Sequence, residues 1–448
     1  MISRLLKLWK GQMNKPIKKP IISIVGTTGV GKSQFSIELA KKINGEVINA
    51  DSMQVYKGAD IITNKHPIEE RENVPHHVMD HVDWSEEYFI HRFNKEANHA
   101  INDIHSRGKI PIIVGGTHYY LQTLLFNNKT MENKKERELT KTEIELLDGP
   151  TNLLFEELQK IDPIIAEKFH PQDHRKLRRA VEIWYTTGQK PSDLYIEQKL
   201  DEQEQSSLKY NTLVFWLYSD PKVLQNRLDK RVDKMMETGA EKEIDELFQH
   251  YSNNNCDCTS GIFQVIGFKE FLQWLENNKQ NETDFAHGLE RMKIRTRQYA
   301  KYQVKWIQKT LHLELQKEAK FDYVNGGRLY ILDATDLSEW EDNVCNRGLA
   351  IAEQFFQQKV TLPETPGHLA GLLTEKTNLK SNKVIGSEQR WKHFKCDVCK
   401  DKNGDSFVAV GEDSWSRHLN SRRHKKNTSA SGKRKHVEEM IRLHKKQS

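Results

Sequence analysis

Long hydrophobic runs are missing from this sequence of 448 residues. None approaches the roughly 18 uninterrupted apolar residues that a membrane-spanning helix needs, and the charged residues, 29% of the total, are spread along the chain. We therefore expect a soluble protein with no membrane partner. With 36% apolar residues the chain is long enough to bury a sizeable core, and its length predicts two or three structural units.

Cysteine is also scarce, with five residues in the whole chain. So small and odd a number argues against the disulfide framework of a secreted protein. We expect a protein of a reducing compartment.

Acidic residues are absent before Glu38, and the charge of the chain is unevenly distributed. The first 20 residues carry +6 and residues 376–448 carry +11, so residues 21–375 carry −11. An acidic body with basic ends indicates an enzyme that has separate cationic segments for phosphate backbones or for targeting.

The basic N-terminal segment, residues 1–20, alternates Leu and Trp with Arg and Lys and lacks a small-residue cleavage site. Two interpretations stay open, a short mitochondrial presequence and a frayed terminus. A start at Met13 would remove most of the amphipathic part. Near the other end, Lys433-Arg434-Lys435 is either a nuclear import signal or further phosphate-binding charge. We expect a cytoplasmic protein with mitochondrial and nuclear pools.

The order of apolar patterns predicts an α/β fold. Short apolar runs alternate with helical patterns over residues 21–130, give way to helical spacing over 131–204, and return as a strand at 213–218. We expect a P-loop parallel-sheet core interrupted by a helical insertion domain and followed by a small C-terminal zinc finger. The expected segments are the basic N-terminal segment (1–20), the core (21–130 and 205–310), the helical insertion (131–204), an extension and linker (311–389), the finger (390–430) and a basic tail (431–448).

A phosphate-binding loop is the clearest motif. Residues 26–33 read GTTGVGKS, follow an apolar strand and precede a helical pattern, as the motif G-x-x-x-x-G-K-[ST] requires. Glycines let successive N–H groups converge on phosphate oxygens, the lysine adds charge, and the serine offers a hydroxyl to Mg²⁺. The simpler alternative is a Gly-rich turn with an exposed lysine. The residues assigned to a diphosphate are Gly26, Thr27, Thr28, Gly29, Val30, Gly31, Lys32 and Ser33.

The acidic residue that ends a strand and holds Mg²⁺ in NTPases is missing. The run Ile110–Val114 leads into Gly115-Gly116-Thr117 instead, which makes ordinary ATP hydrolysis a poor fit. The nearest acid with a suitable place is Asp51, after the strand-like residues 46–48. Its carboxylate would bind metal, act as a base, or cap a helix.

Four motifs together resemble the tRNA dimethylallyltransferases: Gly26–Ser33, Asp51–Tyr56, Gly115–Thr117 and Arg231–Asp233. The resemblance covers about residues 20–310, and the added Cys/His segment is similar to the eukaryotic, fungal type. It implies a P-loop enzyme that transfers a dimethylallyl group from dimethylallyl diphosphate to the N6 amine of the adenosine 3′-adjacent to the anticodon, with release of diphosphate. The implied partners are dimethylallyl diphosphate and the anticodon stem-loop of tRNA, and we expect a monomer.

The resemblance also implies roles for single residues. Asp51 is the general base, Thr28 and Arg231 hold the diphosphate, and Gln54 reads the flipped adenine, with Ser52 and Met53 beside it on the tRNA. These residue types suit the chemistry, because an allylic diphosphate ionises when its leaving group is stabilised. A carboxylate also helps a poorly nucleophilic amine.

Three further basic segments are candidates for tRNA or phosphate contact. In the insertion the tRNA-binding candidates are Arg175, Lys176 and Arg179, and Lys176 departs from the arginine usual in the family, which puts a bidentate phosphate contact there in doubt. Arg227, Arg231 and Lys234 share one side of a helix at i, i+4 and i+7. The segment 295–301 also matches the family. For the last two segments a solvated face is the alternative.

The C-terminal segment has the ligands of a structural zinc site. Cys396 and Cys399 lie two residues apart, and His418 and His424 follow with five residues between them. This is a tetrahedral Cys₂His₂ set, although the 18 residues between the pairs require a longer hairpin than usual fingers have. The segment resembles the matrin or U1-type fingers that bind structured RNA. The alternative is an unrelated set of cysteines and histidines.

Two other functions compete with the transferase. A P-loop kinase would use the phosphate loop, with Asp51 deprotonating a hydroxyl acceptor. A non-catalytic RNA-binding adaptor would use the finger and the basic segments, but it leaves Lys32, Ser33 and Asp51 without a role. ATP as an alternative ligand of the phosphate loop is left open.

Overall fold

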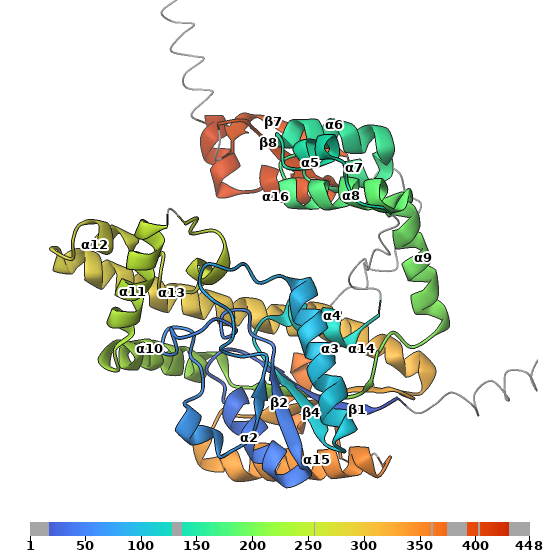
Figure 1. Ribbon diagram of the computed structural model, residues 1–448, viewed down its shortest axis with the longest axis vertical. Coiled ribbons are helices and arrows are strands. Elements are labelled where there is room, and N and C mark those ends of the chain that lie inside the picture. The colour runs from blue at the N-terminus through green and yellow to red at the C-terminus, as the bar shows by residue number, and fades with distance from the viewer. Residues whose placement is uncertain are drawn as a thin grey trace, which may run out of the picture. The chain divides into compact units, whose positions relative to one another are not determined.

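A parallel sheet forms the centre of the first of two units into which the chain divides (Figure 1). The computed structural model describes residues 18–127, 137–254, 256–359, 362–373, 392–401 and 404–429. The six strands run in the order β3-β2-β4-β1-β5-β6 and every described pairing between them is parallel. Their bounds are β1 Pro20–Gly26, β2 Gly45–Asn49, β3 His76–His77, β4 Ile110–Val114, β5 Asn211–Tyr218 and β6 Gly326–Asp333.

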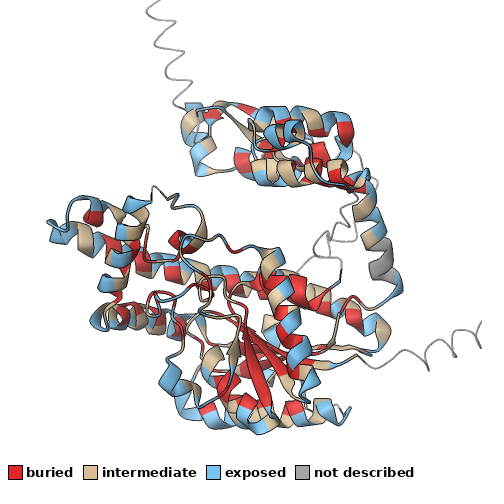
Figure 2. Cartoon of the chain, in the orientation of Figure 1, coloured by how far each residue is buried: buried red, intermediate tan, exposed pale blue. Residues whose placement is uncertain are grey.

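Alternate side chains of β1 enter two different hydrophobic clusters. Ile22 and Ile24 belong to the cluster that includes the helices α2 (Lys32–Ile43) and α15 (Arg347–Phe356), whereas Ile21 and Val25 belong to the larger cluster on the other side. A parallel sheet covered on both faces needs apolar residues at every position, so its strands read as continuous hydrophobic runs. The buried strands at the centre of the first unit are evident in Figure 2.

The helices of the first unit connect these strands and extend the core. The helices, apart from short 3₁₀ and π turns, are α2 Lys32–Ile43, α3 Ile90–Ser106, α4 His118–Leu125, α10 Pro221–Glu237, α11 Ala240–Asn253, α12 Leu272–Glu276, α13 Glu282–Trp306, α14 His312–Gln316 and α15 Arg347–Phe356. The predicted P-loop α/β fold is thus confirmed. Among the described residues, none of the helices combines the length and the apolar character needed to cross a membrane.

The segment expected to be an extension and linker contributes to the sheet. Strand β6 pairs with β5, and α15 and Trp340 pack on the same face as α2. A Cβ atom on Gly31 would lie 2.5 Å from the Trp340 ring, so glycine is the only residue that fits there. The weak hydrophobic periodicity of this segment did not predict a strand. The strand β6 forms because it pairs with β5 at the edge of the sheet.

The second unit combines the insertion with the finger. Its helices and strands are α5 Lys141–Leu147, α6 Thr151–Ile161, α7 Pro163–Lys168, α8 His174–Thr187, α9 Pro191–Glu204, β7 His393–Lys400, β8 Ser406–Val410 and α16 Glu412–Leu419. Leu154, Leu158 and Leu177 lie in its buried core. Asp162 joins two turns of this core, since its carboxylate accepts the N–H groups of Ile165 at 3.2 Å and Ser192 at 2.7 Å.

The finger contacts the loop that precedes α8. His393 Nε2 lies 2.9 Å from the Phe169 carbonyl, His170 Nε2 lies 3.2 Å from the Val408 carbonyl, and Gln172 donates to Asp401 at 2.7 Å. Strands β7 and β8 are antiparallel and are joined through residues 401–405, of which 402 and 403 lie outside the described residues. No sequence pattern predicted this contact between two segments that are far apart in the chain.

Candidate functional site

The P-loop joins β1 to α2 and has the backbone of a phosphate cradle. Gly29 and Gly31 have φ values of 75° and 96°, a region that disfavours residues with side chains. Helix α2 begins at Lys32, and Gly31 at its N-cap contributes no side-chain hydrogen bond to the first turn. The N–H groups of that turn are therefore available to an anion at the positive end of the helix dipole.

A cavity of about 320 Å³ opens at the P-loop. Its lining includes the predicted residues Thr28, Lys32, Ser33, Asp51 and Gln54. The structure therefore brings together the phosphate loop after β1 and the candidate base after β2. Both lie at the carboxyl ends of strands, on either side of β4, where parallel sheets place their ligands.

Lys32 is held beside this cavity by its own loop. Its Nζ donates to the Thr27 carbonyl at 2.7 Å. Burial, with a smaller contribution from nearby Arg231, lowers the pKa of Lys32 to about 8 despite the opposing effect of Asp51. A lysine that is poorly solvated in this way gains stabilisation from a bound anion.

Arg231 on α10 reaches the P-loop and is only partly hydrogen-bonded. One terminal nitrogen donates to the Thr28 hydroxyl at 2.9 Å. Its Nε and its other terminal nitrogen are buried and have no hydrogen-bond partner within the described chain. Burial lowers the pKa of Arg231 to about 10. A buried guanidinium with two unsatisfied donors fits an anionic ligand, because unpaired buried charge is costly.

The other two basic candidates on α10 have different partners. Arg227 donates to the carbonyls of Ala334 and Thr335, and Lys234 lies 3.4 Å from Glu237 on an exposed part of the helix. The three residues share one side of the helix by their i, i+4 and i+7 spacing, but Arg231 lies against the P-loop, Arg227 lies against the residues that follow β6, and Lys234 lies at the surface.

Asp51 lies directly after β2 in a half-buried position. Its carboxylate accepts the Met53 N–H at 2.9 Å, and the backbone N–H groups of Gln54 and Gly116 also face it. Burial raises the pKa of Asp51 above its ordinary value, although these N–H groups and Lys32 oppose the shift. A carboxylate with a raised pKa is a stronger base than an ordinary aspartate.

The loop after Asp51 is fixed by backbone contacts. Ser52 N–H donates to the Thr117 hydroxyl at 2.9 Å, and Met53 is packed against the core. Gln54 Nε2 donates to the carbonyls of Thr63 at 3.1 Å and Asn64 at 2.9 Å. Because its amide nitrogen is occupied, Gln54 presents its oxygen as the remaining hydrogen-bonding atom.

Two residues near the site were not found by sequence analysis. Buried Lys65 donates to the carbonyls of Tyr56 and Gly58 and pairs with Asp60 and Asp80, so it fixes the loop that carries Gln54. A lone lysine in a polar loop gave no signal of burial.

His118 follows Thr117 and stacks on Trp306, with ring centroids 4.7 Å apart. Burial and the nearby Lys32 charge lower its pKa to about 3, so the imidazole is neutral at physiological pH. Its place in the site also comes from tertiary contact rather than from any motif.

The segment 295–301 belongs to α13 and splits into different environments. Arg297 pairs with Asp229 at 2.6 Å and with Glu290 at 3.2 Å, whereas the side chain of Arg295 is 64% exposed. Tyr299 turns toward the site and donates to the Gly116 carbonyl at 3.0 Å. Neither a continuous tRNA surface nor a simple solvated face describes all three.

The predicted tRNA residues of the insertion lie on α8 in the second unit. Arg175 and Lys176 are exposed, Lys176 lies 2.8 Å from Asp173, and Arg179 lies 3.1 Å from Glu182. Asp173 also caps the helix by accepting the Lys176 N–H. These three residues lie near the beginning of α8, which follows the loop that contacts the finger.

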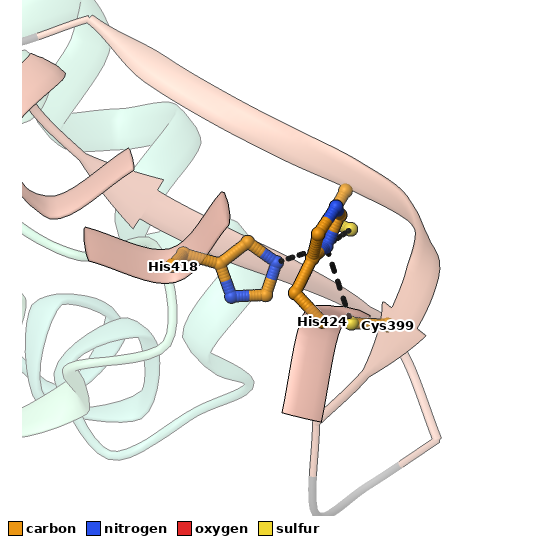
Figure 3. A group of neighbouring side chains, drawn as sticks. Cys399, His418 and His424 are labelled. Atoms are coloured by element: carbon orange, nitrogen blue, oxygen red, sulfur yellow. Dashed lines mark hydrogen bonds between the residues drawn. The ribbon is translucent and has the colours of Figure 1, made fainter. Parts of the chain in front are cut away.

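The four predicted metal ligands converge in the finger. One ligand atom from each of Cys396, Cys399, His418 and His424 lies within 4.8 Å of the others. His424 Nδ1 is 3.5 Å from Cys396 Sγ. It is 3.7 Å from Cys399 Sγ and 3.2 Å from His418 Nε2, and these three residues lie together in Figure 3. Two cysteines from a hairpin and two histidines from the helical segment form the donor set that tetrahedral zinc prefers.

The first unit is that of a P-loop enzyme whose cavity combines an anion cradle with a base. A family model described as IPP transferase matches residues 54–310. The tRNA dimethylallyltransferase of Saccharomyces cerevisiae is 50% identical over 93% of this chain and 94% of that protein. The tRNA dimethylallyltransferase of Homo sapiens is 34% identical over 90% and 85%.

Solved structures agree with the sequence matches. A eukaryotic dimethylallyltransferase whose crystal structures follow its action on tRNA superposes with a TM-score of 0.81 and 48% identity, over 94% of this chain and all of that chain. The tRNA isopentenylpyrophosphate transferase of Bacillus halodurans has a TM-score of 0.50 and 31% identity over 76% and 99%. The chain therefore belongs to the IPP transferase family, as its motifs predicted.

Proposed function

We propose that this chain transfers a dimethylallyl group from dimethylallyl diphosphate to the N6 amine of the adenosine 3′-adjacent to the anticodon in tRNA, releasing diphosphate. The observation that carries the proposal is a cavity lined by Thr28, Lys32 and the carboxylate of Asp51, with Arg231 bonded to the Thr28 hydroxyl and keeping two unpaired donors. Its relatives named tRNA dimethylallyltransferase support the same reaction.

The P-loop and Arg231 act on the leaving group. As the allylic C–O bond breaks, negative charge grows on the diphosphate. The N–H groups at the start of α2, the Lys32 ammonium and the free donors of Arg231 stabilise that charge. Thr28, whose hydroxyl accepts a hydrogen bond from Arg231, is assigned to the diphosphate near its bridging oxygen.

Asp51 acts on the nucleophile. The lone pair of the adenine amine is delocalised into the ring, so loss of its proton to a carboxylate aids attack on the allylic carbon. The free oxygen of Gln54 accepts from the same edge of the flipped base. Ser52 and Met53, beside Gln54, are also assigned to tRNA binding. The insertion residues Arg175, Lys176 and Arg179 are assigned to tRNA phosphates.

Mg²⁺ fits the same phosphate site through oxygen donors. Ser33 lines the cavity with a hydroxyl at the position that P-loops use for the ion. When bound, Mg²⁺ would neutralise charge on the diphosphate oxygens. In this assignment Ser33 is the ligand of Mg²⁺, and Asp51 acts as the base.

A short anticodon stem-loop tests the proposed target. With adenosine 3′ of the anticodon, digestion after reaction with dimethylallyl diphosphate should yield an N6-substituted adenosine. The matched stem-loop with guanosine at that position should yield no prenylated nucleoside. Equal modification of both stem-loops, or of another base, would contradict the proposed target.

Zinc is proposed as the structural ion of the finger. We expect about one equivalent of zinc in the purified protein. Cys396→Ser should lower that content and unfold the finger while the P-loop unit keeps its thermal transition, because the ligand set lies wholly in the second unit. Metal analysis and calorimetry measure both effects. Cys258→Ser is the control, and protein purified without zinc would refute the metal site.

The finger is further proposed to grip tRNA. Arg422, Arg423, Lys425 and Lys426 surround the ligand His424. A chain ending near Ser387 should bind tRNA more weakly, with a smaller slope of log K against log salt, while the chemical step with bound tRNA is nearly unchanged. Equal slopes for the two forms would exclude the finger from phosphate binding.

We also propose a monomer that acts in the cytoplasm with mitochondrial and nuclear pools. The basic residues before Met13 and the run Lys433-Arg434-Lys435 support this distribution, and both lie outside the described residues. Translation from Met13 should shift the protein away from mitochondria, as fractionation of cells expressing each form would measure. Identical distributions of the two forms would exclude the presequence.

A further inference from the structure

Helix α13 places one buried amide between the two loops of the catalytic cavity. Gln303 is 2% exposed. Its Oε1 accepts the Thr28 backbone N–H at 2.8 Å, and its Nε2 donates to the Gly116 carbonyl at 3.1 Å. Both ends of the side chain are therefore used, one on the P-loop and one on the loop after β4.

Tyr299 supports the same loop from one turn earlier. Its hydroxyl donates to the Gly116 carbonyl at 3.0 Å, so this single carbonyl accepts from two side chains of α13. Residues four apart lie on the same side of a helix, which explains how both reach one atom. A helix of 25 residues is a rigid support for them.

Gly116 links these side chains to the base. Its backbone N–H faces the Asp51 carboxylate, and a Cβ atom there would lie 3.1 Å from Asp51 Oδ2 and 2.7 Å from Gln303 Nε2. Glycine has many accessible backbone conformations and no side chain to hold it. The two hydrogen bonds to its carbonyl fix the peptide that follows Gly116, and so hold the Cα from which its own N–H extends toward Asp51.

Thr28 links Gln303 to Arg231, the residue proposed to stabilise the leaving diphosphate. Its N–H is held by Gln303 and its hydroxyl by Arg231. One residue of α13 thus touches both the loop that carries the diphosphate ligand and the loop that orients the base.

We propose that Gln303 and Tyr299 are positioning residues that hold Thr28 and Gly116, and through them fix the diphosphate cradle relative to the base Asp51. Packing alone does not explain them, since a buried amide is costly unless its hydrogen bonds are made, and an apolar side chain fills space without that cost. Elsewhere on the buried side of α13, Met292 and Ala300 fill space in this way. The proposal rests on the role of Asp51 proposed above.

The pH dependence of the chemical step distinguishes positioning from mere structure. Around Asp51 the facing groups are the Lys32 ammonium, the phenols of Tyr120 and Tyr299, and the backbone N–H groups of Met53, Gln54 and Gly116. Burial raises the pKa of both phenols, so they are neutral near pH 7. Removing the Tyr299 hydroxyl therefore removes no charge. It removes the hydrogen bond to the Gly116 carbonyl and the contacts with the side chains of Thr117 and Gln303.

Tyr299→Phe is the decisive variant because it deletes one hydroxyl from a half-buried ring. The Gly116 N–H, which lowers the pKa of Asp51, becomes less well aligned. The acid limb of the single-turnover profile should therefore move to higher pH. The rate at neutral pH should fall by about 10-fold, less than the roughly 10²-fold that a misplacement of about 1 Å can cost. Affinity for tRNA should not change.

Two further variants complete the test. Tyr302→Phe is the matched control, because Tyr302 is 68% exposed on the same helix, and it should leave the rate and profile unchanged. Gln303→Met, which keeps length but loses both hydrogen bonds, should reduce the rate more than Tyr299→Phe. A wild-type rate and pH profile for Tyr299→Phe would overturn the proposal, as would a rate loss with an unshifted acid limb. If Asp51→Asn were fully active, the base itself would be wrong.

Discussion

Replacing Asp51 by asparagine is expected to lower the single-turnover rate of dimethylallyl transfer by about 10²-fold or more, because the amide cannot accept the amine proton. The fold and tRNA affinity should be retained. Asparagine is nearly isosteric and its oxygen still accepts the Met53 N–H that Asp51 accepts at 2.9 Å. Rapid quench with nucleoside analysis measures the rate at saturating tRNA.

The pH dependence of the same variant gives a second expectation. Burial raises the pKa of Asp51 in the folded protein, and the base works only when ionised. The wild-type rate should therefore fall as pH drops through this raised pKa, and the residual rate of Asp51→Asn should lack that limb.

Stability should move in the opposite direction from activity. A carboxyl whose pKa is raised on folding binds its proton more tightly in the native state, so above that pKa its ionised form costs stability. Asp51→Asn should keep or raise the melting temperature. The control Asp83→Asn removes a carboxylate that is 61% exposed and pairs with Lys57, and it should leave turnover unchanged. Turnover by Asp51→Asn at the control's rate would remove Asp51 as the base.

Replacing Arg231 by alanine is expected to reduce kcat by about 10²–10³-fold, the range found when one preorganised donor to developing charge is lost. The Michaelis constant for dimethylallyl diphosphate should rise as well, because the proposed role of Arg231 includes contact with the diphosphate in the ground state. Affinity for tRNA should be unchanged. Lys32→Ala should act in the same direction through the loss of the ammonium beside the cavity.

The unliganded Arg231→Ala protein should also be at least as stable as the wild type. Burial lowers the pKa of this guanidinium to about 10, so its charged form is disfavoured by folding at neutral pH. Such a residue is retained for its ligand rather than for the fold.

Lys234→Ala is the matched control for Arg231→Ala, because Lys234 lies on the same helix and its side chain is 69% exposed. It should leave kcat and both Michaelis constants near wild type. If Arg231→Ala changed only the affinity for tRNA, the residue would be a nucleic-acid contact and the leaving-group assignment would fail.

The parts of the molecule that sequence could predict are those with local patterns. The P-loop needs glycines at fixed spacing before a lysine, and β1 needs a continuous apolar run because both of its faces are covered. Asp51 was found because it follows a strand at the edge where ligands bind. The four Cys/His ligands were found by their spacing.

The parts that sequence could not predict depend on contacts between distant segments. Gln303 reaches a residue 275 positions away, and no spacing rule connects them. Arg227 and Arg231 look equivalent in the sequence of one helix. Only the tertiary structure shows that Arg227 donates to backbone carbonyls and that Arg231 donates to Thr28. Strand β6 has its partner in β5, so its weak local pattern was not enough to predict it.

The most direct test of the account is to incubate the purified protein with unmodified tRNA, Mg²⁺ and either dimethylallyl diphosphate or ATP, and then to weigh the digested nucleosides. We predict that dimethylallyl diphosphate adds one dimethylallyl mass to adenosine, that ATP adds nothing, and that Asp51→Asn and Arg231→Ala lose the product. Phosphate transfer from ATP to an acceptor, without any prenylated adenosine, would contradict the account and favour a P-loop kinase.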